Sequence, residues 1–397
     1  MKILMITPYL PFPLSSGGQI RTYNLLKNLS KKHQISLFSF IRTNEEKKYI
    51  PKLKEFCIDV KTFSKRPPWS ITSLTLSALS LYPLVVCMYL KKELKQEIQE
   101  AIGREHFDLI HAETFYVMPN IPQNNIPTIL VEQTIEYLVY KHFTETIKMP
   151  PLKLLMEFDV HKINYWEKKF WQKASRVVAM SDADKKVMRD QNPTLTVDLV
   201  PNGVDTDFFK LESRLDHKTQ TVLFVGNFKW LQNREAVAYL VNQVWPQITK
   251  RLPKARLWIV GKFPTTDVLK LGSNSVQISS DIEDIREAYS NSDVLLAPIY
   301  GPGGTRYKIL ESMATGLPVV TTPIGIEGLN AVHNREALIG KTKQMLASET
   351  VRVLTDRNLY RILAINGRKL VEKNFNWKII ASRLNDIYLK ASHERKN

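Results

Sequence analysis

The fold of this chain is decided by one stretch, Gly301-Pro302-Gly303-Gly304-Thr305-Arg306-Tyr307-Lys308-Ile309-Leu310-Glu311-Ser312-Met313-Ala314-Thr315-Gly316-Leu317-Pro318-Val319-Val320. The apolar run 293–299 before it predicts a buried strand. The stretch itself predicts a glycine-rich loop, then a helix that ends at Thr315-Gly316, and then a second strand from Leu317 onward.

Charged and small residues at the start of this helix predict an anion site. Gly303 and Gly304 leave backbone N–H groups open where the helix dipole favours negative charge. Arg306 and Lys308 add positive charge, and an arginine grips phosphate oxygens in a fork. Glu311, further along the helix, is suited to accept hydrogen bonds from sugar hydroxyls. The stretch therefore predicts a cradle for phosphate and ribose, and hence a nucleotide-linked ligand.

Apolar runs of strand length alternate with amphipathic stretches of helix length along the whole chain. This alternation predicts parallel sheets with helices on both faces. Because the runs form two series, we expect an α/β protein with two doubly wound, Rossmann-like domains facing a central cleft, and ligands at the carboxyl ends of the strands. The expected strands are Ile3–Thr7, Ile35–Ile41, Leu109–Ala112, Thr128–Val131, Arg176–Met180 and Thr196–Val200, then Val222–Val225, Leu257–Val260, Val276–Ile278, Val294–Ala297 and Val319–Thr322.

A turn sequence, Pro201-Asn202-Gly203, marks the boundary between the two series. We expect an N-terminal domain over 1–200, on the acceptor side, and a C-terminal domain over 201–375 that binds the nucleotide. The polar stretch 210–220 is the expected linker, and 376–397 is the expected closing helix and tail.

Four motifs along the chain resemble those of one enzyme family. Lys308–Val320 is similar to a helix of the type K-x-x-E-A/S-M-A-x-G followed by P-V-V, and Gly226–Asn233 is similar to a first C-domain strand and phosphate loop. Val200–Asp205 is similar to a P-N-G-V-D interdomain turn, and Asn376-Trp377 to a closing segment. The chain thus resembles the retaining GT-B glycosyltransferases, specifically the glycosyl transferases group 1 family (family four of the glycosyltransferase classification).

The resemblance implies the GT-B fold, in which the last helix crosses back to the N-terminal domain. It also implies a retaining, metal-independent hexosyltransferase that takes a nucleotide-diphosphate sugar as donor. The implied acceptor is a saccharide or lipid-linked saccharide, in the synthesis of cell-surface polysaccharide or glycoconjugate. No cofactor is expected beyond the donor itself.

Donor-binding residues follow from the same resemblance. Gly17 and Gly18, in a loop before a helix expected from about Gln19, are expected to approach the donor phosphates. Asn227 and Lys229 occupy the loop where relatives place an Arg and a Lys. Lys229 is either a diphosphate ligand or an ordinary exposed lysine.

The chain departs from the family's paired glutamates, E-x7-E. Glu311 matches the later Glu, which in the family holds the ribose, whereas Gly303 stands in place of the first. The resemblance then assigns the contacts to the donor sugar to Gly303-Gly304-Thr305, through backbone amides and the threonine hydroxyl. Arg306 and Lys308 are expected to neutralise the diphosphate and to act as catalytic charges.

A second departure lies in the segment 131–137, where relatives often have H-N-I-E. Gln133 stands at the position of the His, close to the reacting carbon of the donor sugar. A glutamine orients a hydroxyl but is no base, which is tolerable if the departing phosphate takes the acceptor proton. On the acceptor side, Glu136 orients the acceptor or Arg21, or is a surface residue at a helix start. Arg21 either faces the cleft or is a solvated helix residue.

No metal site is expected. The two cysteines, Cys57 and Cys87, lie in apolar company, which favours a reducing compartment over a disulfide framework. Asp182-Ala183-Asp184 and Asp205-Thr206-Asp207 both fit D-x-D. The first is better explained as the start of a helix capped by Ser181, and the second as part of the interdomain turn.

The formal net charge is +17, and the first hundred residues hold 16 Lys and Arg against 7 Asp and Glu. This excess is either a solvated surface or an attraction to an anionic membrane face. Nucleic acid is not an expected partner, since no nucleic-acid motif accompanies the charge. The segment Ile71–Leu90 is too polar for a membrane span and is expected to be a surface or interfacial helix. We expect a cytoplasmic protein that is peripheral at the inner face of the cell membrane.

Two alternative functions stay open on the sequence. One is a GT-B nucleotide-sugar epimerase, which needs no acceptor. The other is a catalytically impaired nucleotide-sugar-binding subunit, which Gly303 and Gln133 motivate. A dehydrogenase is disfavoured, because the first loop lacks G-x-G-x-x-G and the second strand ends without a ribose-binding acid.

Overall fold

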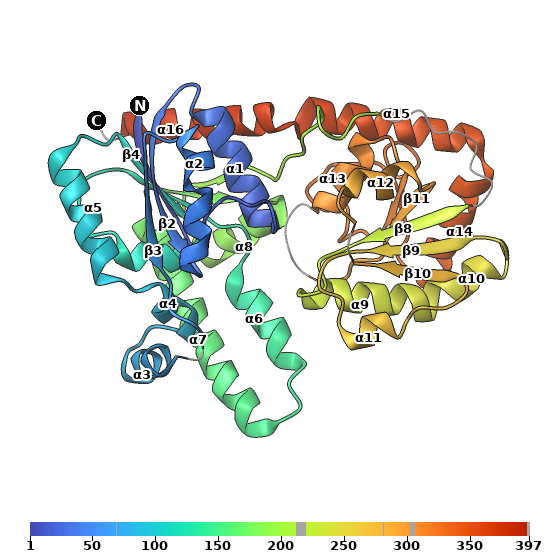
Figure 1. Cartoon of the computed structure of the whole chain (residues 1–397), viewed down its shortest axis with the longest axis horizontal. Helices are drawn as coiled ribbons and strands as arrows, with labels where there is room; N and C mark the ends of the chain where they lie inside the picture. Colours follow the sequence, from blue (N-terminus) through green and yellow to red (C-terminus); the bar gives the residue numbers. More distant parts are fainter. Residues whose placement is uncertain (69, 212–219, 281, 302–305, 395–397) are drawn as a thin grey trace. The chain divides into compact units, whose positions relative to one another are not determined.

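The computed structural model describes residues 1–394 apart from 69, 212–219, 281 and 302–305. It divides into two compact units, each with one sheet (Figure 1): unit 1 comprises Met1–Pro201 and Ile380–Asn397, and unit 2 comprises Asn202–Ile379. The residues 303–305 and most of the expected linker lie outside the described residues.

Unit 1 is built on a seven-stranded sheet of order β3-β2-β1-β4-β5-β6-β7, in which every pair is parallel. The central strands are buried on both faces, as in a sheet covered by helices on both sides. The strands are β1 (Lys2–Thr7), β2 (Gln34–Ile41), β3 (Asp59–Ser64), β4 (Leu109–Glu113), β5 (Thr128–Val131), β6 (Arg176–Ala179) and β7 (Val197–Leu199).

The helices of unit 1 include one long pair, α6 and α7, which extends beyond the sheet in Figure 1. The helices are α1 (Gly17–Leu29), α2 (Ile50–Lys54), α3 (Ile71–Leu79), α4 (Leu84–Tyr89), α5 (Lys92–Arg104), α6 (Glu136–Glu145), α7 (Pro150–Lys173) and α8 (Asp182–Gln191), with short 3-10 turns at Asn44–Tyr49 and Phe115–Asn120.

Unit 2 contains a six-stranded parallel sheet of order β10-β9-β8-β11-β12-β13. Successive residues of β8 serve two separate cores: Val222 and Phe224 pack with α9, α10 and α14, whereas Leu223 packs with α12, α13 and α15. This alternation places helices on both faces of the sheet. The strands are β8 (Thr221–Val225), β9 (Arg256–Val260), β10 (Val276–Ser279), β11 (Val294–Ala297), β12 (Val319–Thr321) and β13 (Leu338–Ile339).

The last helix, α16 (Trp377–Glu394), starts in unit 2, and its residues from Ile380 onward belong to unit 1. Within unit 1, Asn385 bonds His33 and Tyr388 bonds His111, which fixes the helix against the sheet. The other helices of unit 2 are α9 (Leu231–Tyr239), α10 (Trp245–Thr249), α11 (Thr266–Leu269), α12 (Ile285–Ser290), α13 (Tyr307–Ala314), α14 (Lys343–Thr355) and α15 (Arg357–Asn374), with a π-turn at Leu240–Val244.

The predicted fold class, two doubly wound parallel sheets, is confirmed. Two strands were missed because neither forms an apolar run of strand length. Of β3 only Val60 is buried, because this strand lies at the edge of its sheet, and β13 is two residues long. The expected single helix over Ile71–Leu90 is wrong: Pro83 separates an exposed α3 from a buried α4.

Both sheets reverse their winding at one point, between β1 and β4 in unit 1 and between β8 and β11 in unit 2. At such a point the crossover helices leave in opposite directions, so the carboxyl ends of the two strands stay uncovered and ligands bind there. The order of strands therefore directs attention to the loops after β1, β4, β8 and β11.

The loops after β8 and β9 touch so closely that only glycine fits. A Cβ on Gly261 would lie 1.7 Å from the carbonyl oxygen of Gly226. We expect Gly261→Ala to lower the free energy of unfolding by about 2 kcal/mol or more, because backbone would have to move. Gly103→Ala, in the open on α5, is the matched control and should stabilise by about 0.5–1 kcal/mol. Urea unfolding measures both, and equal effects would contradict the close approach.

Candidate functional site

In unit 2, the helix α13 starts beside the switch point and ends as the sequence predicted. Gly316 has a φ of 72° and donates its N–H to Met313, while Leu317 donates to Ser312. This pair of bonds is the Schellman stop, which requires a left-handed residue. The start of the helix is defined from Arg306 onward, and the predicted donor-binding residues Gly303, Gly304 and Thr305 fall outside the described residues.

Lys308 lies half-buried in the first turn of α13 and links it to the neighbouring loop. Its Nζ donates to Asn233 Oδ1 at 2.7 Å and lies 4.5 Å from the centre of the Phe224 ring. Burial, and then the charge of Arg306, lowers the pKa of Lys308 to about 7, although Glu311 opposes the shift. The site thus holds two cationic groups whose charges repel, as a site does when it is adapted to an anion.

Glu311 lies on the same helix and is oriented by a second buried residue. The hydroxyl of Tyr289 donates to Glu311 Oε2 at 2.7 Å. Burial raises the pKa of Glu311, while the Tyr289 hydrogen bond and the charge of Lys308 act in the other direction. Arg306, at the helix start, donates to the carbonyl oxygen of Gly301 at 2.7 Å.

The loop between β8 and α9 brings the second set of predicted donor residues to this place. Asn233 Nδ2 donates to the carbonyl oxygen of Asn227 at 2.8 Å, and Asn227 Oδ1 accepts the N–H of Lys229. Asn233 therefore joins this loop to Lys308. Lys229 itself is exposed, with Nζ 3.5 Å from the centre of the Phe263 ring.

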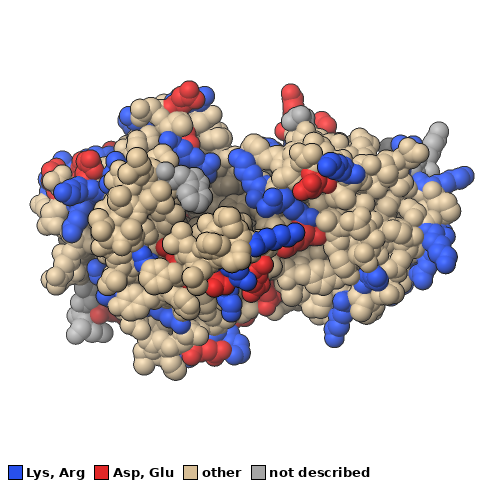
Figure 2. Space-filling view, turned by 90° about the horizontal axis from the view of Figure 1, so that it is seen from below, with Lys and Arg blue, Asp and Glu red and all other residues tan. Residues whose placement is uncertain are grey.

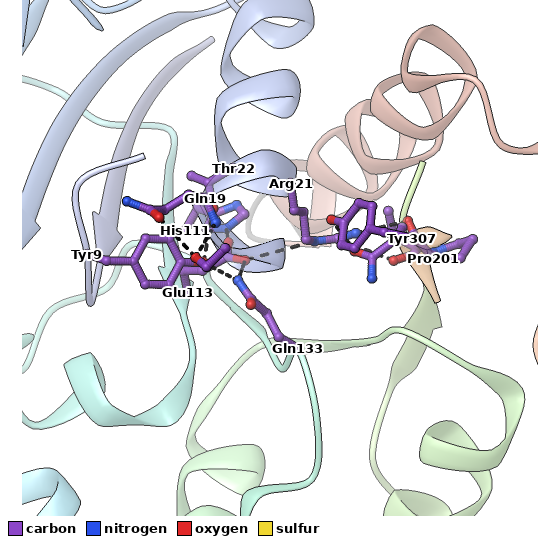
Figure 3. Close-up of polar contacts among 12 residues, drawn as sticks. Tyr9, Gln19, Arg21, Thr22, His111, Glu113, Gln133, Pro201 and Tyr307 are labelled. Carbon is purple, nitrogen blue, oxygen red and sulfur yellow. Dashed lines mark hydrogen bonds and ion pairs between the residues drawn. The ribbon is translucent and has the colours of Figure 1, made fainter. Parts of the chain in front are cut away.

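In unit 1, a fully buried carboxylate, Glu113, lies at the end of β4 (Figure 3). His111, two residues earlier and therefore on the same face of the strand, bonds Glu113 Oε2 at 2.7 Å. Because a carboxylate only accepts, His111 Nε2 carries the hydrogen, and Nδ1 faces the Tyr388 hydroxyl at 2.5 Å. Burial would raise the pKa of Glu113, but the bond to His111 and the charges of His111 and Arg21 hold it below its usual range.

Gln133 is held by this carboxylate and by Tyr9. Its Nε2 donates to Glu113 Oε1 at 2.7 Å and also to the hydroxyl of Tyr9. Both amide hydrogens are then engaged, so the side chain offers its oxygen as an acceptor. That oxygen lies 2.6 Å from where a Cβ on Gly18 would be. The arrangement can orient a ligand hydroxyl but cannot remove a proton.

The glycine loop differs from the sequence prediction in one respect. The helix α1 begins at Gly17, not at about Gln19, because Ser16 caps it by accepting the N–H of Gln19. Gly18 therefore belongs to the first helical turn. The side chains that approach it are those of Tyr9 and Gln133.

Arg21 is not a solvated helix residue, which was one of the two interpretations of the sequence. Its side chain is 1 % exposed and donates to the carbonyl oxygens of Pro201 and Val200 at 2.9 and 3.0 Å. Its Nε lies 3.9 Å from Glu113 Oε1. Arg21 thus connects α1 to the backbone at Val200 and Pro201 and to the carboxylate of Glu113.

Glu136 begins α6, is half-buried, and lies beside two buried acids, Glu132 and Glu167. The carboxylate of Glu167 accepts the backbone N–H groups of Glu136 and Tyr137, and Glu132 Oε1 accepts the indole N–H of Trp171. Burial raises the pKa of Glu136 to about 7, although a hydrogen bond with Tyr116 lowers it. Glu136 is thus bonded to Glu167 and to Tyr116, both residues of unit 1.

Several residues of these networks were not predicted as site residues, among them Tyr9, Glu113, Asn233 and Tyr289. Glu113 carried a usable signal, since it is an acid at the end of an apolar strand. The two tyrosines carried none, because a buried aromatic residue is first of all a core residue.

The D-x-D segments have the structural roles expected of them. Ser181 caps α8 by accepting the N–H of Asp184, and Asp205 accepts the N–H groups of Asp207 and Phe208 in a turn. Among the described residues, no group of three or more His, Cys, Asp or Glu side chains is arranged to hold a metal ion.

Comparison with known proteins matches both halves of the chain. Residues 15–208 match the family model "Glycosyltransferase Family 4", and residues 219–356 match the model "Glycosyl transferases group 1". An uncharacterised 44.6 kDa protein from the cps region of Klebsiella pneumoniae is 21% identical over 398 residues, which cover 96% of this chain and 98% of the relative. A phosphatidyl-myo-inositol mannosyltransferase of Mycobacterium tuberculosis is 25% identical over 231 residues, 53% of this chain and 58% of the relative.

Solved structures share the architecture. A sucrose-phosphate synthase from Thermosynechococcus elongatus superposes with a TM-score of 0.71 at 19% identity, covering 98% of this chain and 99% of that one. The Anabaena protein HepE, solved in complex with UDP and glucose, has a TM-score of 0.66 at 17% identity, with 98% and 100% covered. These likenesses establish the fold.

The shifted pKa of Glu136 predicts a pH-dependent stability. Glu136 ionises near 7 when folded and near its usual 4.5 when unfolded, so its burial costs stability above pH 7 and nothing below pH 4.5. Glu136→Gln should therefore stabilise the protein at pH 8 by about 1–3 kcal/mol, with a gain that shrinks as the pH falls to 5. Urea unfolding at both pH values measures it. Glu145→Gln, at the exposed end of α6, is the control for simple loss of a charge, and a gain independent of pH would contradict the prediction.

Proposed function

Since the chain belongs to the glycosyl transferases group 1 family, we propose that this glycosyltransferase uses a nucleotide-diphosphate sugar as donor and retains the anomeric configuration. The observation that carries the donor assignment is the cluster of Arg306, Lys308, Glu311 and Asn233 at the carboxyl ends of β8 and β11. Two cations with one oriented carboxylate match a diphosphate followed by a ribose. HepE, a protein of the same fold, binds UDP together with glucose.

In the proposed reaction, the acceptor hydroxyl oxygen forms a bond to the anomeric carbon while the bond to the diphosphate oxygen breaks on the same face. The departing phosphate oxygen takes the acceptor proton, so the protein needs no base. Arg306 and Lys308 stabilise the charge that develops on the diphosphate. Gln133, whose amide hydrogens are engaged by Glu113 and Tyr9, accepts a hydrogen bond from a sugar hydroxyl. No metal ion or other cofactor has a role in this proposal.

The proposed acceptor is a saccharide or lipid-linked saccharide, in the synthesis of cell-surface polysaccharide or glycoconjugate. Support comes from relatives: one lies in a cps region and another is a mannosyltransferase for phosphatidyl-myo-inositol. A lipid-linked acceptor requires the enzyme to work at a membrane surface. None of the helices that the structure describes combines the length and the apolar character of a membrane span.

A ligand screen followed by a transfer assay tests the function. A thermal-shift series with UDP, GDP, CDP, ADP, their sugars and NAD should show stabilisation by one nucleoside diphosphate, about 2.7 kcal/mol at one hundred times the dissociation constant. Transfer with retention is then followed by NMR on saccharide acceptors. Conversion of the donor without acceptor would identify an epimerase, binding without transfer an impaired subunit, and a selective response to NAD would overturn the proposal.

Arg306→Ala is the matched variant for this assay. We expect a loss of about 10²–10³ in turnover with an unchanged thermal midpoint, because the residue acts on the developing charge. Arg335→Ala, an exposed arginine of the same unit, is the control. Near wild-type turnover of the Arg306 variant would remove this residue from the mechanism.

Lys308 gives the donor affinity a pH dependence. With a pKa of about 7 in the free protein, Lys308 is mostly neutral at pH 8.5, and a bound diphosphate would require it to take up a proton. The dissociation constant of the nucleotide sugar should therefore rise by up to about tenfold per pH unit above pH 7. Calorimetry at pH 7 and 8.5 measures this. The neutral variant Lys308→Met should bind more weakly with no such slope, and a wild-type affinity equal at both pH values would place Lys308 away from the diphosphate.

A further inference from the structure

Large apolar side chains gather on one exposed part of unit 1, formed by α3, the turn after it and α7. Leu79 is 90 % exposed, Leu81 77 % and Leu154 70 %, and Leu155 and Phe158 are more than half exposed. Exposed leucines in isolation are common, but a cluster of them marks an interaction site. We call this set of residues, with Ile71, the apolar surface.

Two segments distant in sequence are fixed side by side in the apolar surface. Lys162 Nζ on α7 donates to the carbonyl oxygens of Ser77 at 2.6 Å and Ser80 at 3.3 Å. The indole N–H of Trp166 donates to the carbonyl oxygen of Leu81 at 2.8 Å, and its ring lies 4.2 Å from that of Tyr82. Lys162 and Trp166 of α7 therefore hold the exposed leucines at the end of α3 in place.

The charges around the apolar surface are mostly positive. The segment 71–83 contains no charged residue, and Lys148, Lys153 and Lys169 lie on or beside α7. Two acids lie on the same part of α7: the exposed Glu157, which pairs with Lys153 at 3.9 Å, and Asp159, which accepts the backbone N–H of Leu84. A hollow of ≈ 470 Å³ next to Tyr82 and Trp166 is lined by Lys95, Lys169 and Lys173, so it presents ammonium groups beside aromatic rings.

We propose that the apolar surface docks on a lipid bilayer with anionic headgroups, the leucines of α3 and α7 entering the acyl boundary and the lysine-lined hollow taking a headgroup phosphate. A stripe of exposed apolar residues edged mainly by lysines is the composition of interfacial helices. Only the role of this docking rests on the proposed function: it would bring the enzyme to a lipid-linked acceptor.

The shape and charge of the surface favour a bilayer over a second copy of the chain. The hairpin of α6 and α7 extends beyond the sheet in Figure 1 and ends in exposed residues, which suits insertion. A symmetric dimer through this surface would bring two lysine-edged patches together, where like charges repel. Figure 2 looks onto this end of unit 1, and uncharged residues cover most of the unit in that view.

Vesicle sedimentation tests the proposal, with phosphatidylcholine alone or mixed with phosphatidylglycerol. The full chain should bind the mixed vesicles and release them in high salt. The variant Leu79→Ser/Leu154→Ser/Leu155→Ser should bind at least about tenfold more weakly. The control Val332→Ser/Ile362→Ser/Ile365→Ser removes three exposed apolar side chains from unit 2 and should bind like wild type. Lys148→Gln/Lys153→Gln/Lys169→Gln should lose the preference for phosphatidylglycerol, about fivefold per lysine.

The outcomes separate docking from catalysis. The docking proposal is overturned if wild-type protein does not bind mixed vesicles, or if the unit 2 control loses as much binding as the leucine variant. Either result leaves the donor assignment intact. Wild-type dimers that dissociate in the leucine variant, seen by sedimentation without vesicles, would identify a second copy as the occupant and overturn the lipid proposal. A leucine variant that still binds nucleotide and transfers sugar to a soluble acceptor, but no longer binds vesicles, supports the docking proposal.

Discussion

A parallel sheet that reverses its winding between two neighbouring strands leaves their carboxyl ends uncovered, and both units of this chain are built around that reversal. Everything placed at these ends must be held by side chains and loops, because no crossover helix packs there. In unit 2, Asn233 holds the loop after β8 against Lys308 by hydrogen bonds to both. In unit 1, Glu113 at the end of β4 holds Gln133 by a hydrogen bond.

The buried carboxylate of Glu113 fixes the orientation of the Gln133 side chain. A glutamine side chain has two orientations of nearly equal shape, and only its partners decide which atom faces the ligand. Glu113 accepts and cannot donate, since His111 and Arg21 keep it ionised, so Gln133 must turn its nitrogen towards it. His111 and Arg21 offset the cost of burying the Glu113 charge. As a result, the amide oxygen of Gln133 is a hydrogen-bond acceptor with a fixed direction. Tyr388 extends the same chain of bonds to α16.

Much of the fold followed from apolar periodicity, because the inner strands such as β1 and β5 are buried on both faces and therefore read as continuous apolar runs. The edge strand β3 could not be predicted in this way, since its sequence is mostly polar and only Val60 is buried. The site was predictable where local rules apply, as at the Gly316 stop and the Ser181 cap. It was not predictable where the determinant is distant: Arg21 is buried only because the carbonyl groups of Val200 and Pro201 lie next to it.

The electrostatics of α13 differ from those of an ordinary core. A core lysine would be paired with a carboxylate, but Lys308 has Asn233 and Phe224 as its partners, and Arg306 lies close enough to lower its pKa. Glu311, the acid on the same helix, is already engaged by Tyr289. Such an arrangement is less stable than a neutral one of the same shape, and proteins keep unfavourable charge of this kind mainly where a ligand relieves it. An anion with more than one charge relieves it best, which agrees with the proposed diphosphate donor.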